Sequence, residues 1–191
     1  MIGNWDRVLL ARHGQTEWNV VGRRQGQQDS PLTALGIEQA RRHAVAAAGA
    51  DRVFTSPQGR ATATARLIAE ALDVSVVVVD ELAEIHHGEF AGLTDLEIEA
   101  RFPAEWWDRT EDKYEWRFPG GESYADADPR ALRALEKVAA DRSRRPLIVT
   151  HEMLSRLLLR HLLGLTPQDA LARRHPHDVV FAVGPDGLAS I

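Results

Sequence analysis

Residues 9–19 read LLARHGQTEWN, an apolar run that ends abruptly in Arg12 and His13 and is followed by a polar turn. The run is typical of a β-strand. Because open α/β sheets bind ligands beyond the carboxyl ends of their strands, we expect His13 to lie where a substrate can reach it. Arg12 offers a cation beside this imidazole, and Thr16 and Asn19 add short hydrogen-bonding side chains. The stretch predicts an anion-binding site at a strand end, although a surface histidine before a capped helix is the alternative.

Apolar strands alternate with helical periods along most of the chain. We expect strands at 7–11, 52–55, 76–79 and 146–150, and helices at 35–48, 59–72 and 153–163. The runs at 76–79 and 147–149 are continuously apolar, as expected for strands that helices cover on both faces. This pattern predicts an α/β fold of three layers, with an open, mostly parallel sheet between helices.

Helix-boundary residues support these ranges. Thr33 is a plausible N-cap for the first long helix, which Gly36 weakens in its first turn and Gly49 ends. Gly164 similarly ends the last long helix.

The composition indicates one domain over residues 1–191, with 44% hydrophobic residues to form a continuous core. The formal net charge of −5 argues against a general nucleic-acid or anionic-membrane binder, so an anion site must be local. The chain has no cysteine, which excludes disulfides, thiolate nucleophiles and sulfur-based zinc sites. With no apolar leader at its start, we expect a cytoplasmic protein.

Two segments depart from the alternation. Residues 103–121 are rich in tryptophan and end in Pro-Gly-Gly, and we interpret them as an insertion over the ligand-binding edge of the sheet. This insertion is either a lid that selects the leaving group or a packed surface loop or dimer contact. Residues 178–183 and 188–191, around a Pro-Asp-Gly turn, predict a hairpin of edge strands.

Two further polar residues follow predicted strands. Arg60 lies in the opening turn of the helix after the second strand, where the helix N-terminus already favours anions. His151 directly follows the apolar run 146–150, as His13 follows the first strand. Each residue alone is more typical of a surface charge or a packed histidine, but together they predict one cationic pocket at the mouth of a parallel sheet.

A carboxylate is expected at the same mouth. Glu84 follows the third strand and could donate a proton there, while Glu81 and Glu89 are competing candidates that spacing alone does not separate. A metal site at residues 86–87 or 175–178 is disfavoured, because neither has the ligand spacing of strong sites.

Taken in order, these segments resemble the histidine phosphatase superfamily, specifically its phosphoglycerate-mutase-like branch, over nearly the whole chain. The motifs that carry the resemblance are RHGQTEWN at 12–19, GRRQG at 22–26, DSPLT at 29–33 with Gly36, SP at 56–57 with Arg60, Leu82 with Glu84, Gly88 and Gly92, PGGES at 119–123 and VTH at 149–151. Two positions depart from the pattern of many members, which have Glu in place of Gln15 and Gly in place of Glu152. The carboxylate of Glu152 is expected near the pocket entrance, and this departure leaves substrate selectivity less certain than catalysis.

The resemblance implies roles for the matching residues. For catalysis it implies His13 as nucleophile, Arg12, Arg60 and His151 as the phosphate pocket, and Glu84 as proton donor. For substrate binding it implies Thr16, Asn19 and Gln25. A hydrogen bond from the other ring nitrogen of His13 should fix the neutral tautomer that attacks phosphorus.

The predicted activity is a metal-independent phosphatase that hydrolyses small phosphorylated metabolites through a phosphohistidine and needs no cofactor. A phosphoglycerate-mutase-type transfer is the nearest alternative, and the short segment between Glu84 and Pro119 favours the phosphatase. A non-catalytic module that binds a phospholigand is a second alternative, against which the set of His13, Glu84 and His151 argues. We expect no nucleic-acid or membrane partner, and a homodimer is left open.

Overall fold

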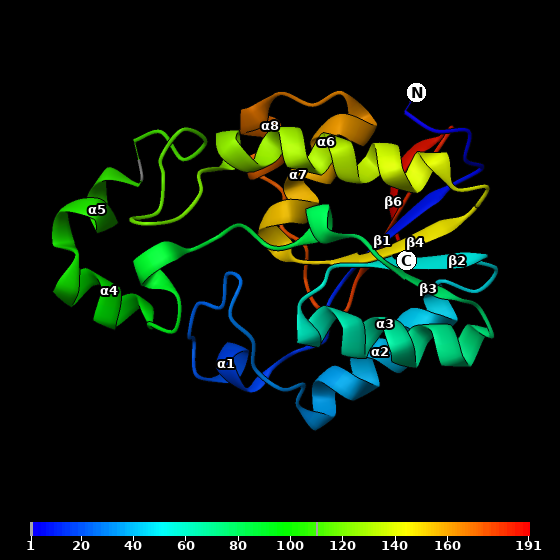
Figure 1. Ribbon diagram of the computed structural model, residues 1–191, viewed down its shortest axis with the longest axis horizontal. Helices are drawn as coiled ribbons and strands as arrows, with labels where there is room; N and C mark the ends of the chain where they lie inside the picture. The colour runs from blue at the N-terminus through cyan, green and yellow to red at the C-terminus, as the bar shows by residue number, and fades with distance from the viewer. Residues whose placement is uncertain (1, 110) are drawn as a thin grey trace.

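A six-stranded sheet forms the centre of the computed structural model, which describes residues 2–109 and 111–191 (Figure 1). The strand order is β3-β2-β4-β1-β5-β6. The strands are β1 (Val8–Arg12), β2 (Arg52–Thr55), β3 (Val76–Val78), β4 (Pro146–Thr150), β5 (Val180–Gly184) and β6 (Gly187–Ser190). The first four are parallel, while β5 and β6 are antiparallel to their neighbours. The prediction of a mostly parallel sheet is confirmed.

Helices cover both faces of this sheet, which makes the three predicted layers (Figure 1). On one face lie α2 (Ala34–Ala46) and α3 (Gly59–Leu72). On the other lie α6 (Tyr124–Ala140), α7 (Glu152–Leu163) and α8 (Pro167–Leu171). The helix predicted to reach residue 48 ends at Ala46, and Gly164 ends α7 in the left-handed conformation, as expected.

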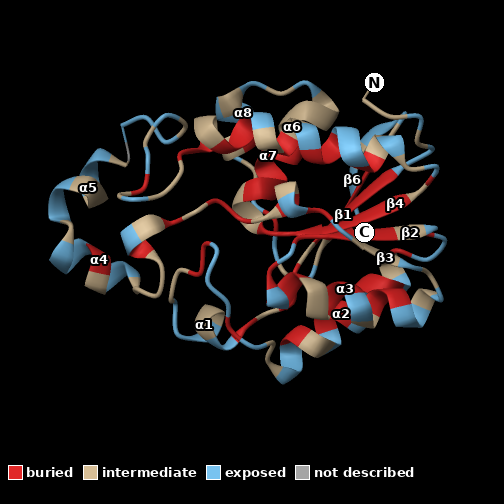
Figure 2. Cartoon of the chain, viewed as in Figure 1, coloured by how far each residue is buried: buried red, intermediate tan, exposed pale blue. Residues whose placement is uncertain are grey.

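The alternation of side chains along each strand builds two cores. Leu9 and Ala11 of β1 pack in the cluster that α2 and α3 cover, whereas Val8 and Leu10 pack in the cluster on the side of α6 and α7. The cluster under α2 and α3 is largely alanine, so these helices lie close to the strands. Figure 2 shows the strands buried between exposed outer helix faces.

Short elements lie beyond the carboxyl ends of the strands. They are α1 (Glu17–Val20), the 3₁₀ turns η1 (Asp80–Leu82) and η2 (Gly88–Phe90), and the helices α4 (Asp95–Arg101) and α5 (Pro103–Asp108). Helices α4 and α5 project away from the sheet (Figure 1). The predicted insertion at 103–121 therefore begins with a helix, and its function as a lid stays a prediction.

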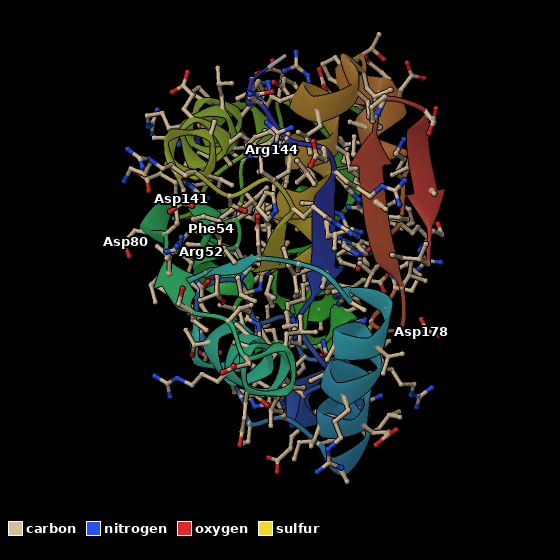
Figure 3. All side chains as sticks on the ribbon, turned by 90° about the vertical axis from the view of Figure 1, so that its right-hand side faces the viewer. Arg52, Phe54, Asp80, Asp141, Arg144 and Asp178 are labelled. Carbon is tan, nitrogen blue, oxygen red and sulfur yellow. The ribbon has the colours of Figure 1, made fainter. Side chains whose placement is uncertain are left out.

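The opposite edge of the sheet is where β2 and β4 begin (Figure 3). There Arg52 and Asp141 form an ion pair with an N···O distance of 3.6 Å, and Arg144 pairs with Asp6. Such exposed pairs contribute about 0 to 1 kcal/mol each to stability. The fold places its buried charges at the other end, where the strands finish.

The C-terminal hairpin forms as predicted around Gly187, but only β6 is an edge strand. β5 pairs with β1 on its other side, with Leu9 opposite Ala182, because its apolar residues are buried against both cores. The prediction of two edge strands is wrong for β5. In the described parts of the chain, no helix has both the length and the apolar character needed to cross a membrane.

Candidate active site

Strand pairing brings together the carboxyl ends of β1, β2 and β4, which are far apart in the sequence. In the parallel pair of β1 and β4, Arg12 lies opposite Thr150, so the next residues, His13 and His151, are neighbours at the same edge. The backbone N–H of His13 donates to the Thr150 carbonyl at 2.9 Å. On the other side of β4, Thr55 of β2 lies opposite Val149, and α3 begins shortly after.

The His13 imidazole is held with a proton on one ring nitrogen and a lone pair on the other. Its Nδ1 lies 2.8 Å from the carbonyl oxygen of Gly14, to which only a protonated nitrogen can donate. This assigns the proton to Nδ1 and leaves the lone pair on Nε2. Burial lowers the pKa of His13 well below its usual range, and the charge of Arg60 lowers it further. His13 is therefore a neutral imidazole with an available Nε2.

Arg60 links the two histidines. Its Nε donates to His13 Nε2 at 3.2 Å, and its Nη2 donates to His151 Nδ1 at 3.0 Å. The guanidinium is buried and is held by Asp29 at 2.9 Å and by the Gly26 carbonyl at 2.8 Å. Asp29 also accepts from the backbone N–H of Arg60, so one carboxylate fixes both the start of α3 and its cation.

His151 is the N-cap residue of α7 and is completely buried. Because Arg60 donates to its Nδ1, its proton lies on Nε2, which donates to Ser56 Oγ at 2.7 Å. Burial lowers the pKa of His151 well below its usual range, with a further contribution from the charge of Arg60. The ring centroids of His13 and His151 are 5.2 Å apart. The guanidinium of Arg60 thus contacts both imidazoles.

Arg12 adds a second guanidinium, and its Nη1 already donates hydrogen bonds to the protein. Its Nη1 donates to Glu152 Oε2 at 2.8 Å and to the His175 carbonyl at 3.2 Å. Its Nε is buried and finds no hydrogen-bond partner within residues 2–109 and 111–191. A buried guanidinium nitrogen without an acceptor is costly, so this side of Arg12 suits an incoming anion.

Of the three candidate proton donors, Glu84 is the one that lines this mouth. It is 6% exposed, and its Oε1 accepts from the backbone N–H groups of Ile85 and Leu154 at 3.0 Å each. Burial raises the pKa of Glu84, although these backbone bonds and the charge of Arg60 oppose the shift. Of the competing candidates, Glu81 pairs with Lys137 at 2.5 Å and Glu89 is exposed.

These groups open into one cavity of about 830 Å³. The lining includes four of the five residues predicted for catalysis, namely Arg12, His13, Arg60 and Glu84, together with Asn19 and Gln25. His151 is not part of the lining: it is fully buried and contacts Arg60. Thr16 does not belong to the lining. It is fully buried as the N-cap of α1, accepts from the Asn19 N–H and receives a hydrogen bond from Gln25 Nε2 at 2.9 Å. Thr16 therefore holds the two predicted substrate-binding residues that line the cavity, and the roles of all three in substrate binding stay predictions.

The insertion supplies one wall of the cavity. Trp116 and Phe118 line it with rings 4.9 Å apart, while Trp106 lies outside the lining with the guanidinium of Arg109 at 4.1 Å from its ring. Arg109 and Lys113 also line the cavity. No group of three or more metal-ligating side chains occurs among the described residues.

Three residues of the site were not among the predicted site residues. Ser56 holds His151, Arg156 binds Glu152 at 2.8 Å, and His177 donates through Nδ1 to the His13 carbonyl at 2.7 Å. Arg156 carries a usable signal, since a Glu four residues before an Arg in a helix predicts a side-chain pair. His177 carries none, because its contact joins residues 164 positions apart.

Comparisons with known proteins agree with this geometry. The sequence profile of the histidine phosphatase superfamily (branch 1) matches residues 8–184. A probable phosphoglycerate mutase GpmB of Serratia proteamaculans is 40% identical over 165 residues, which cover 83% of this chain and 75% of the relative. Phosphoserine phosphatase 1 of Hydrogenobacter thermophilus is 33% identical over 83% of this chain and 77% of its own.

A solved structure shares the fold closely. Mycobacterial glucosyl-3-phosphoglycerate phosphatase, determined in complex with VO3, has a TM-score of 0.82 and 30% sequence identity, and the match covers 93% of this chain and 90% of that one. The similarity extends over the sheet and both helical layers.

Proposed function

The chain belongs to branch 1 of the histidine phosphatase superfamily, and we propose that it hydrolyses small-molecule phosphate monoesters through a phosphohistidine on His13. The observation that carries this proposal is that Arg60, in the lining of the cavity with His13, lies 3.2 Å from His13 Nε2 and 3.0 Å from His151 Nδ1. A neutral nucleophile, fixed cations and a carboxylic acid are the groups that phosphoryl transfer requires.

In the first step, the phosphoryl group takes the place that Arg60 Nε now occupies against His13 Nε2. The lone pair of Nε2 attacks phosphorus in line as the bond from phosphorus to the ester oxygen breaks. Arg60 and the unpartnered edge of Arg12 stabilise the charge on the equatorial oxygens, and His151 joins them when its proton lies on Nδ1, the nitrogen that faces Arg60. Glu84 gives its proton to the departing oxygen, so the product leaves as a neutral alcohol.

In the second step, the Glu84 carboxylate takes a proton from a water molecule that attacks the phosphohistidine. The bond from phosphorus to Nε2 breaks, inorganic phosphate leaves, and His13 returns to its neutral form. Glu84 thus ends the cycle protonated, as it began.

The substrate class follows from the size and walls of the cavity. A volume of about 830 Å³ leaves room beyond the phosphoryl site for a leaving group the size of a sugar acid or amino acid. The relatives named for phosphoglycerate and phosphoserine act on compounds of this size, and we propose the same class here.

The experiment is a direct comparison of hydrolysis with isomerisation. Purified protein is incubated with 3-phosphoglycerate, O-phosphoserine and 4-nitrophenyl phosphate, and released phosphate and 2-phosphoglycerate are measured together. The proposal predicts phosphate release without isomerisation. Isomerisation faster than phosphate release would identify a mutase, and no turnover of any substrate would indicate a module that only binds phospholigands.

A further inference from the structure

Glu152 holds an unusual position for a carboxylate in a site that binds anions. It is the first residue of α7, directly after His151, and it lines the cavity. Its two oxygens bind two different guanidiniums, Arg12 at 2.8 Å through Oε2 and Arg156 at 2.8 Å through Oε1. A fixed negative charge therefore lies within contact distance of the cation that faces the phosphoryl group.

The two arginines have other anchors. Arg12 also donates to the His175 carbonyl, and its side chain is only 15% exposed. Arg156 donates to the Tyr124 hydroxyl and, through Nε, to the Arg173 carbonyl at 2.8 Å. Each guanidinium thus keeps at least one hydrogen bond to the protein that does not involve Glu152. What Glu152 adds is charge.

The charge balance of the cavity shows where that addition matters. Eight arginine or lysine residues line it, against three acidic residues. Of the acids, Asp95 pairs with Arg24, and Glu84 accepts from backbone N–H groups at the start of α7. Glu152 is the acid that binds Arg12. Lys113 and Arg109, which also line the cavity, form no ion pair with any described carboxylate.

We propose that Glu152 is a specificity-determining residue: its carboxylate is an internal counter-anion that competes with the anionic groups of substrate and product for Arg12 and Arg156. The inference rests on the proposed function for its catalytic consequences, but not for the binding that it predicts. Glu152 weakens the retention of inorganic phosphate, and it reduces the preference of the cationic cavity for leaving groups that carry a second negative charge. A residue that only positioned Arg12 would have the opposite effect on anion binding.

The first test is the affinity for inorganic phosphate, measured by isothermal titration calorimetry on the wild-type protein and on Glu152→Gln. Gln keeps the size of the side chain and removes its charge. We expect phosphate to bind about tenfold more tightly to the variant, because one nearby negative charge is lost in a partly buried site. Glu136→Gln on α6 is the matched control, since Glu136 is exposed and its loss changes the net charge equally. Its phosphate affinity should equal that of the wild type.

The second test compares two substrates that differ at one group. The ratio of kcat/KM for 3-phosphoglycerate to that for glycerol 3-phosphate, which has a neutral hydroxymethyl group in place of the carboxylate, should rise in Glu152→Gln. Glu152→Ala repeats both measurements should the Gln variant not fold, as checked by circular dichroism.

Unchanged or weaker phosphate binding in the folded variant would overturn the inference, and so would the absence of phosphate binding in every protein. Tighter phosphate binding without turnover of any ester would support the inference while the proposed function failed. Tighter phosphate binding with an unchanged substrate ratio would overturn the part of the inference that concerns specificity.

Discussion

His13 and Glu84 are both buried, and burial suits each to the part that we propose for it. The pKa of His13 is lowered, so the imidazole stays neutral and nucleophilic, whereas the pKa of Glu84 is raised, so the carboxyl group holds a proton to donate. In both cases desolvation is the first cause, because the neutral form of each group is the one that tolerates burial. One physical effect therefore suits both groups, in the same cavity, to the proposed roles of nucleophile and acid.

Replacing Glu84 with Gln tests the role of the acid. The loss in kcat/KM should reach about 10²- to 10⁴-fold for glycerol 3-phosphate, whose alkoxide needs a proton to leave. It should be clearly smaller for 4-nitrophenyl phosphate, which releases a stable phenolate. Steady-state kinetics on both substrates give the comparison, and Glu89→Gln, an exposed neighbour, should change neither rate. Equal losses for the two substrates in Glu84→Gln would assign proton donation to another group.

The junctions between strands and helices hold these residues in register. After β1, the backbone of Gly14 and Gln15 lies directly against the first turn of α2, where a Cβ built on Gly36 would lie 2.1 Å from the Gln15 carbonyl oxygen. From sequence, Gly36 only weakened the start of a helix. In the structure it permits close contact between α2 and the loop that carries His13. A tertiary contact therefore explains a residue that is unfavourable for the helix itself.

Gly36→Ala should therefore disturb both stability and activity. The added methyl group must push the loop or α2 aside, and such overpacking costs about 1 to 3 kcal/mol in the free energy of unfolding. Urea denaturation measures this loss. The value of kcat should fall as well, because the displaced loop carries His13 with it. Gly184→Ala in β5 is the control, since its Cβ would make only ordinary contacts at 3.5 Å. Full activity with unchanged stability in Gly36→Ala would refute this role.

The sequence allowed the positions of His13, His151 and Arg60 to be predicted because each follows an apolar run, and parallel strands end at one edge. It could not separate the role of Thr16 from that of Asn19. The two residues share one helical turn, and which of them faces a cavity depends on the entry angle of α1. The pairing of Arg12 with Glu152 could not be predicted from the sequence either, since it joins residues 140 positions apart. Local chemistry was predictable, while contacts set by tertiary packing were not.

The whole molecule is built around several buried histidines in their neutral form. Burial lowers the pKa of His87 and His175 to about 3 and that of His177 to about 4, and it lowers those of His13 and His151 as well. The unfolded chain exposes these imidazoles, which then take up protons below about pH 6.5. Proton uptake on unfolding means that acid favours the unfolded state.

The free energy of unfolding should therefore be constant above about pH 7 and fall as the pH drops from 6.5 toward 4. Because the folded-state pKa values are lowered, each of these groups contributes stability above its unfolded pKa that is lost on acidification. We expect a decrease of about 1 kcal/mol per pH unit or more, the amount for one fully depressed histidine. Urea denaturation at a series of pH values measures the slope, and His87→Phe should reduce it. A flat profile between pH 6.5 and 5 would contradict the prediction.

The central claim of the proposed function is the transfer of a phosphoryl group to His13. The direct measurement is a rapid-mixing experiment with 4-nitrophenyl phosphate, quenched in alkali after milliseconds and followed by peptide mass spectrometry. We predict a phosphate group on the peptide that contains His13, stable to base and lost in acid, and absent from His13→Ala. Phosphate release by the wild-type protein with a covalent phosphate on another residue, or with undiminished activity in His13→Ala, would contradict the account.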